Sequence, residues 1–226
     1  MRSPFFALSL LAAAAAVALS GAPTATPVAA QSARGASATP PASAWTIGPI
    51  ISGRNYSRGM PLHPAQGRNG AVVIDLPRSP GSVHYVTHRF GSLAGKRRIV
   101  MRFRVEAAPG VRILPSTAPA LPSIATLYFQ RSGDNWSGRR QFEAFRWYGT
   151  FATQTLSPGE HVMVAPLSGN WTAVETSSAR TNPRAFADAV ANADQVGFVL
   201  GGGDGYGHGV FATGPARIVV TDFRVE

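Results

Sequence analysis

Apolar and polar residues alternate with a period of two in several short segments of this chain, and glycine- and proline-rich turns separate these segments. The clearest alternation runs through 98–106, where every second residue is apolar: Ile99, Met101, Phe103 and Val105. Successive side chains of a strand point to opposite sides, so this pattern predicts a strand with one buried face. We therefore expect these four side chains to face a core.

Further segments have strand-like composition between turn signals. They are 45–52, 71–76, 82–87, 124–130, 141–148, 161–166, 195–200 and 217–226. In the last segment we expect Val219, Phe223 and Val225 to face inward. In 141–148 both alternating rows hold aromatic residues, so the pattern leaves its buried face open. Only 183–193 has helical composition. Many short strands and one short helix predict an all-β fold, an antiparallel β-sandwich of the jelly-roll kind.

Residues 1–30 have the pattern of a cleaved secretory signal peptide. Arg2 precedes an almost wholly apolar run over 4–19, and the small residues 28–30 precede Gln31. The run is shorter than the roughly 20 apolar residues that a membrane anchor needs. We therefore expect a periplasmic or secreted protein that begins at Gln31 and has no membrane span after cleavage.

The segment that follows, 31–44, is rich in Ala, Ser and Pro, which predicts a flexible leader. The remaining residues, 45–226, then form one β-sandwich domain. The chain has no cysteine, so neither disulfides nor a lipid attachment through cysteine can support it. A domain of this size buries roughly 70% of the surface of its unfolded chain, which is enough for a core without such supports.

Basic residues are unevenly distributed along the chain, whose formal net charge is +10. Between 31 and 146 there are 16 basic and 4 acidic residues, and between 147 and 226 there are 4 basic and 7 acidic residues. This distribution predicts a basic face that attracts a glycan or another anionic polymer. We do not expect nucleic acid as the partner, because export and the lack of a recognition motif argue against it.

Catalytic and metal-binding signatures are missing from the sequence. It contains no G-x-S-x-G elbow, no H-E-x-x-H and no phosphate-binding loop. His84 and His88 share a face of a predicted strand, but they lie about 13 Å apart, too far for one metal ion. We therefore expect no catalytic residues and no metal ligands, although Glu143, Glu160 and Glu175 leave a glycosidase as an alternative.

Two turns carry side chains suited to ligand binding. The turn between the segments 124–130 and 141–148 holds a tryptophan, Trp136, in a polar surrounding, and an exposed aromatic ring can stack on a sugar ring. The glycine-rich stretch 201–209 follows an apolar strand, and its glycines allow a backbone to approach a ligand closely. This stretch is either the wall of a binding site or a wide loop at the end of a sandwich.

Several segments together resemble secreted bacterial jelly-roll domains: HYVTHRFGSLAGKRRIVMRFRVE, LYFQRSGDNWSG, FRWYGT, LSPGE, GNWTAV, VGFVLGGGDGYGHGV and ARIVVTDFRV. Over most of 45–226 the chain is similar to carbohydrate-binding modules of the galactose-binding-like type. By position, the resemblance implies these ligand-binding residues: Arg131, Asp134, Trp136, Arg139, Trp147, Tyr206 and His208. It also implies a structural calcium ion between the first and last strands. Asp222 and Glu226 are the acidic residues near that place, and the first strand offers none, so we expect no cofactor.

These observations favour a secreted, non-catalytic carbohydrate-binding domain with a preference for anionic glycans. One alternative is a structural or protein-interaction domain of the cell envelope. Another is a polysaccharide lyase or glycosidase, in which arginine neutralises a uronate and Tyr206 or His208 moves the proton.

Overall fold

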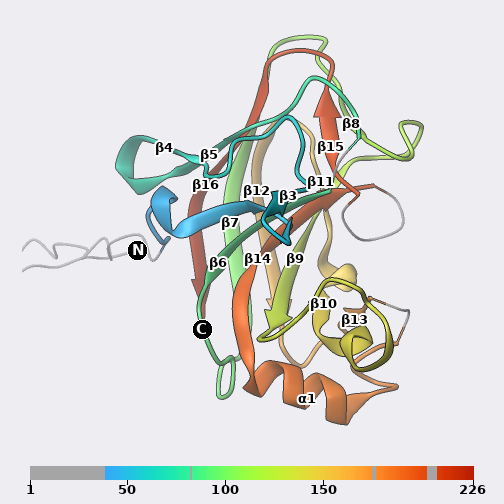
Figure 1. The fold of residues 1–226 in the computed structure, drawn as a ribbon. Coiled ribbons are helices and arrows are strands. Elements are labelled where there is room, and N and C mark those ends of the chain that lie inside the picture. The colour runs from blue at the N-terminus through green and yellow to red at the C-terminus, as the bar shows by residue number, and fades with distance from the viewer. Residues whose placement is uncertain (1–38, 82, 175–176, 203–207) are drawn as a thin grey trace, which may run out of the picture. The chain divides into compact units, whose positions relative to one another are not determined.

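Two antiparallel sheets stacked face to face form the body of the protein (Figure 1). The computed structural model describes residues 39–81, 83–174, 177–202 and 208–226. The seven-stranded sheet contains, in spatial order, β1 (Trp45–Gly48), β6 (His84–Arg89), β14 (Ala193–Gly201), β9 (Ile124–Arg131), β10 (Arg146–Tyr148) and β13 (Thr172–Ala173), with β11 (Gln154–Thr155) beside β9. The five-stranded sheet contains β12 (Gly159–Pro166), β7 (Arg98–Ala107), β16 (Ala216–Val225), β5 (Val72–Asp75) and β4 (Ala65–Gln66).

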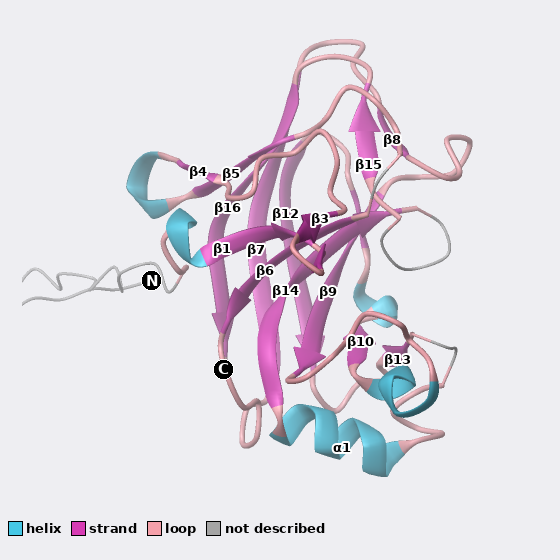
Figure 2. Ribbon diagram, viewed as in Figure 1, coloured by secondary structure: helices cyan, strands magenta, loops and turns pink. Residues whose placement is uncertain are grey.

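Smaller elements complete the part of the chain that the structure describes (Figure 2). Two further strand pairs are β2 (Ile50–Ile51) with β3 (Arg54–Asn55), and β8 (Ile113–Pro115) with β15 (Val210–Ala212). One α-helix, α1 (Pro183–Ala191), lies in the segment for which a helix is predicted. Four 3₁₀ turns are η1 (Ala42–Ala44), η2 (Arg68–Gly70), η3 (Arg140–Ala144) and η4 (Thr150–Ala152).

The path of the chain is that of a jelly roll. From β5 onward the chain crosses between the sheets: β5, β7, β12 and β16 belong to one sheet, whereas β6, β9, β14 and their neighbours belong to the other. All pairings within the two sheets are antiparallel. The prediction of an all-β antiparallel sandwich with one short helix is therefore confirmed.

The core lies between the two sheets, and the alternation along β7 is confirmed in it. Ile99, Met101 and Phe103 are fully buried, and Val105 is 2% exposed. Each faces side chains from the seven-stranded sheet in one continuous apolar cluster. Burial of a single Phe or Ile side chain stabilises a fold by about 1.5–3 kcal/mol, so this strand anchors the sandwich.

The last strand, β16, corrects one prediction about the core. Its pairing with β7 shifts between Val220 and Asp222, which marks a β-bulge. A bulge inserts one extra residue and so changes which side chains face inward. Ile218 and Val220 belong to the core before the bulge, and Phe223 belongs to it afterwards. Val219 instead lies on the outer face, so the prediction that it faces the core is wrong.

The segment 141–148 forms a strand only at its end. The 3₁₀ turn η3 occupies Arg140–Ala144, and the strand β10 covers Arg146–Tyr148. Within η3, the N–H of Phe142 donates to the carbonyl of Arg139 at 3.1 Å. The strand pairs with β9, so the predicted hairpin exists, but its connection spans 132–145 and is longer than the predicted turn.

The described chain begins at Thr39, and its first residues pack against the sandwich. The Thr39 hydroxyl oxygen accepts a hydrogen bond from the N–H of Phe223 at 2.9 Å. Ala42 is buried, and its N–H donates to the side-chain carbonyl of Gln66 at 3.0 Å. Residues 39–44, assigned to the leader on composition, thus contact the domain, whereas the predicted signal peptide lies outside the described residues. Within the described ranges, no helix is long and apolar enough to cross a membrane.

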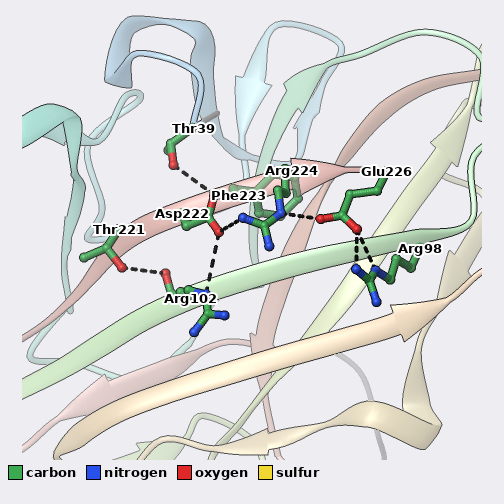
Figure 3. A network of polar contacts seen from close by, with 8 residues as sticks. All are labelled: Thr39, Arg98, Arg102, Thr221, Asp222, Phe223, Arg224 and Glu226. Carbon is green, nitrogen blue, oxygen red and sulfur yellow. Dashed lines mark hydrogen bonds and ion pairs between the residues drawn. The ribbon is translucent and has the colours of Figure 1, made fainter. Parts of the chain in front are cut away.

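Arginines of β7 pair with carboxylates from the second half of the chain on the outer face of the five-stranded sheet (Figure 3). Arg98 lies 2.5 Å from Glu226, and Arg102 lies 3.8 Å from Asp222. Further along β7, Arg104 pairs with Glu160 of β12. Surface pairs of this kind each contribute about 0–1 kcal/mol, but together they cancel charge. The basic face that the sequence predicts is therefore not formed by β7.

Candidate functional site

The outer face of the seven-stranded sheet carries polar and aromatic side chains in rows that run across the strands. The alternation of each strand and the register of pairing place these residues together. One row is Arg89, Gln195, Gln130 and Arg146; a second is Thr46, Thr87, Gly197, Tyr128 and Tyr148; a third includes Tyr85 and Val199. Most of these side chains are buried although they lie outside the sandwich core, because loops cover this face.

Three tyrosines form the aromatic centre of this face. The hydroxyl oxygens of Tyr85 and Tyr148 lie 2.8 Å apart, and the hydroxyl of Tyr128 donates to the side-chain carbonyl of Gln130 at 2.9 Å. The rings of Tyr85 and Tyr128 meet edge to face at 5.1 Å. Burial raises the pKa of all three phenols, most for Tyr128 and Tyr148. The phenols therefore stay neutral and act as hydrogen-bonding groups.

A buried ion pair fixes the loop that covers the tyrosines. Asp134 and Arg146 lie 2.9 Å apart, and their side chains are 0% and 8% exposed. Gln130 donates a hydrogen bond from its amide nitrogen to the same carboxylate at 2.9 Å. Burial raises the pKa of the Asp134 carboxyl, and the guanidinium of Arg146 opposes this rise. The loop from β9 is thus tied to β10 by a charge pair that water does not reach.

Trp136 lies on top of this ion pair and is held from several sides. Its ring lies 5.0 Å from the guanidinium carbon of Arg146 and meets Tyr85 edge to face at 5.1 Å. Its backbone N–H donates to the Asp134 carboxylate at 3.1 Å, and its φ angle is 65°. Non-glycine residues adopt this left-handed conformation rarely and often at functional sites. The half-buried indole is therefore presented in a fixed orientation.

A cleft of about 480 Å³ lies beside Trp136 and follows strand β6. Its lining is Ala44, Thr46, Gly48, Pro49, Ile50, Tyr85, Thr87, His88, Arg89, Trp136 and Gln195. Pairing of β1 with β6 brings Gly48 beside Tyr85 at one end and Thr46 beside Thr87 in the middle. Arg89 marks the other end. From Tyr85 to Arg89 the strand advances by about 13 Å, which gives the length of the cleft floor.

The middle of the cleft floor consists of polar groups with one fixed hydrogen bond. The hydroxyl of Thr87 donates to the side-chain carbonyl of Gln195 at 3.0 Å, which turns the amide nitrogen of Gln195 away from Thr87. Thr46, directly across from Thr87, is half-buried. Beside these groups, Ile50 is 42% exposed and forms an apolar wall. The cleft thus combines flat apolar surface with hydrogen-bonding groups.

Of the predicted site residues, the structure brings Asp134 and Trp136 together. Trp136 lines the cleft, whereas Asp134 is covered and holds the loop. Trp147 lies on the opposite side of β10, in the sandwich core: its side chain is 0% exposed, and its ring meets Phe186 at 4.9 Å. Trp147 therefore does not reach the cleft, and the row of β10 that the sequence left open is settled, with Trp147 inward.

The other predicted site residues lie away from the cleft. Arg131 pairs with Asp188 of α1 at 2.8 Å, and Arg139 is exposed in the covering loop. His208 is exposed just before β15 and does not belong to the cleft lining. Tyr206 lies outside the described residues.

Sequence reasoning missed the residues that make the cleft floor. Tyr85, Thr87 and Arg89 alternate with inward residues along β6, so they share its outer face. The signal that could have identified them is this alternation of tyrosine, threonine and arginine opposite a histidine-valine row. Hydrophobicity does not reveal this alternation, because β6 is buried on both faces and its inward row also contains the polar residues His84 and His88.

The inward histidine His84 fills a polar gap in the core. The Ser57 hydroxyl and the Nδ1 atom of His84 lie 2.6 Å apart, and the Nε2 atom lies 3.0 Å from the Val210 carbonyl. The carbonyl only accepts, so Nε2 carries the proton and Ser57 donates to Nδ1. Burial lowers the pKa of His84 to about 4. His84 therefore links three segments of the chain in its neutral form.

The stability of the protein is expected to fall as the pH decreases from 6.5 towards 4. In this window the unfolded His84 binds a proton, whereas the folded one does not, so acid favours unfolding. The loss attributable to His84 reaches about 3 kcal/mol. His84→Asn should show a shallower dependence of the unfolding free energy on pH, measured by urea denaturation at each pH. An unchanged slope in the variant would contradict the assignment.

Asp222 and Glu226, the acidic residues near the calcium position that the resemblance implies, are both engaged by arginines. Both carboxylates contact guanidinium groups: Asp222 lies 2.6 Å from Arg224, and Glu226 accepts from Arg98 at 2.7 Å (Figure 3). The neighbouring arginines lower the pKa of Glu226 through hydrogen bonds. Calcium takes six to eight oxygen ligands, including carboxylates, and a carboxylate held by guanidinium groups is less available to a cation. The arrangement therefore does not fit the calcium ion that the family resemblance implies.

Comparison with known proteins adds little to this geometry. No protein-family model matches the chain, and no curated protein matches it significantly. One solved structure that matches in part is described as a "putative glycoside hydrolase" from Bacteroides vulgatus. The two chains are 11% identical, the match covers 71% of this chain and 75% of that chain, and the TM-score is 0.31. A TM-score this low supports no inference about function.

Proposed function

We propose that this chain is an exported, non-catalytic carbohydrate-binding domain that binds its glycan in the cleft beside Trp136. The observation that carries the proposal is the fixed indole of Trp136 at one end of a polar cleft. Aromatic rings bind the apolar C–H faces of sugars, and the polar groups of Thr46 and Gln195 can bind sugar hydroxyls. Binding sites commonly combine apolar surface with a few placed polar groups in this way.

The chemistry of the cleft favours binding over glycoside hydrolysis. Hydrolysis requires two carboxyl groups roughly 5–9.5 Å apart at the glycosidic bond. The described cleft lining contains no aspartate or glutamate, and the nearby Asp134 is covered and paired with Arg146. A lyase would need a base. Burial raises the pKa of Tyr85, which makes it a poor base at neutral pH. The ring of His88, also in the lining, packs against Trp45 and Phe223 in the core.

Replacing Trp136 by alanine is expected to weaken glycan binding at least tenfold, which corresponds to about 1.4 kcal/mol. The loss follows from removal of the stacking surface at one end of the cleft. An array of neutral and acidic oligosaccharides first identifies a glycan that the mature protein binds. Calorimetry then measures the affinity of the wild type and of each variant for that glycan. Trp136→Phe should keep most of the affinity because it retains an aromatic face.

A matched control separates stacking from a general loss of surface aromatic groups. Phe151 is 44% exposed, lies on η4 and does not line the cleft, so Phe151→Ala should leave binding unchanged. Thermal unfolding of each variant shows whether it is folded. If the wild type binds no glycan, or if Phe151→Ala weakens binding as much as Trp136→Ala does, the proposed function is wrong.

A further inference from the structure

Two side chains of the cleft, Gln195 and Arg89, can offer only donors to a ligand. Because the side-chain carbonyl of Gln195 accepts from Thr87, the group that Gln195 can offer to a ligand is its amide nitrogen, a donor. Arg89 lines the far end, and a guanidinium group only donates. No carboxylate belongs to the described lining. A ligand that complements such a cleft presents acceptors, and a carboxylate is the strongest acceptor among common sugar substituents.

The charge of Arg89 is available, whereas that of Arg146 on the same row is not. Arg146 is covered and paired with Asp134. Arg89 is exposed, and no ion pair found among the described residues includes it. The neighbouring His88 donates from Nδ1 to the Arg89 backbone carbonyl at 2.9 Å and does not contact the guanidinium group through this bond. Among the described residues that line the cleft there is therefore one cation, Arg89, and no carboxylate.

The positions of Trp136 and Arg89 also set a minimum size for the ligand. Trp136 contacts Tyr85, and Arg89 follows Tyr85 by four residues on the same extended strand. The backbone positions of Tyr85 and Arg89 are about 13 Å apart. Thr87 lies between them on the same face, opposite Thr46. We expect a ligand that stacks on Trp136 and also reaches Arg89 to be longer than one sugar ring.

We infer that the cleft selects an acidic oligosaccharide, with one sugar ring stacked on Trp136 and the carboxylate of a neighbouring uronic acid bound by Arg89. This inference rests on the proposed function and adds to it the ligand class and the residue that determines specificity. A guanidinium group binds a carboxylate through two parallel hydrogen bonds, which gives both affinity and orientation.

The test compares uronic acid oligosaccharides with the same oligosaccharides after reduction of their carboxyl groups to alcohols. The wild type should bind the acidic forms at least tenfold more tightly, as measured by calorimetry. Arg89→Gln should remove this preference and change the affinity for the reduced forms by less than twofold. A monomeric uronic acid should bind more weakly than the dimer, because it cannot contact Trp136 and Arg89 at once.

A control variant separates a specific contact from the general attraction of a basic protein for anions. Arg112 is exposed and does not line the cleft, so Arg112→Gln changes the net charge equally and should keep the preference. The inference is overturned if Arg89→Gln retains the preference, if Arg112→Gln loses as much of it, or if the wild type binds acidic and reduced forms equally. Absence of binding to either form would instead remove the proposed function itself.

Discussion

Replacing Arg146 by methionine is expected to destabilise the protein by about 3–5 kcal/mol. The change leaves the Asp134 carboxylate in a position that is 0% exposed without its counterion, because methionine offers no charge. It also removes the cation that lies 5.0 Å from the Trp136 ring, so the covering loop loses its anchor. Urea denaturation at neutral pH, followed by fluorescence, measures the loss.

The double variant Arg146→Met/Asp134→Asn provides the control for this effect. With the carboxylate removed as well, no buried charge remains uncompensated, and Gln130 can still bind the amide that replaces it. The double variant should therefore be more stable than Arg146→Met alone. The loss of stability in the double variant is compared with the losses in Arg146→Met and in Asp134→Asn. If the two single losses add up to the loss in the double variant, Asp134 and Arg146 contribute independently and the ion pair does not hold the loop.

Replacing Phe223 by alanine is expected to cost about 3–5 kcal/mol. Phe223 is 1% exposed, and its ring meets Trp45 edge to face at 5.0 Å and His88 at 5.4 Å. Its removal leaves a cavity where the last strand contacts the first strand, and the rigid aromatic neighbours cannot close it. The free energy of unfolding in urea measures this cost.

Phe90→Ala is the matched control for Phe223→Ala. Phe90 is 38% exposed and follows β6 at the edge of the same aromatic group. Loss of a partly exposed ring leaves no cavity, so the expected cost is about 1 kcal/mol or less. Equal losses in the two variants would show that Phe223 does not occupy the core.

The sequence predicts the sandwich well because its signals are local. Alternation along 98–106 identifies the buried face of β7, and Gly- and Pro-rich turns mark where strands end. The bulge after Val220 is not visible in the sequence, because it depends on how β16 pairs with β7. Alternation alone therefore predicts the wrong direction for Val219, although it predicts the right direction for Phe223 beyond the bulge.

The candidate site is less predictable because residues from distant strands make it. Polar composition of the covering turn identifies Trp136, whose cleft position depends on contacts with Tyr85 and Arg146. Strand β9 is buried on both faces, so its polar outward row cannot be distinguished from its core row by hydrophobicity. Only the register of pairing shows that Gln195 and Thr87 meet on one face.

The pairing of β7 arginines with late carboxylates has a consequence for the order of assembly. Arg98 and Arg102 leave the ribosome well before their partners Glu226 and Asp222, which lie in or just after the strand β16. Until then the nascent polypeptide is a polycation whose repulsion opposes compaction. The outer face of the five-stranded sheet can therefore become neutral only after β16 and Glu226 have been synthesised, which makes this late segment necessary for closing the sheet.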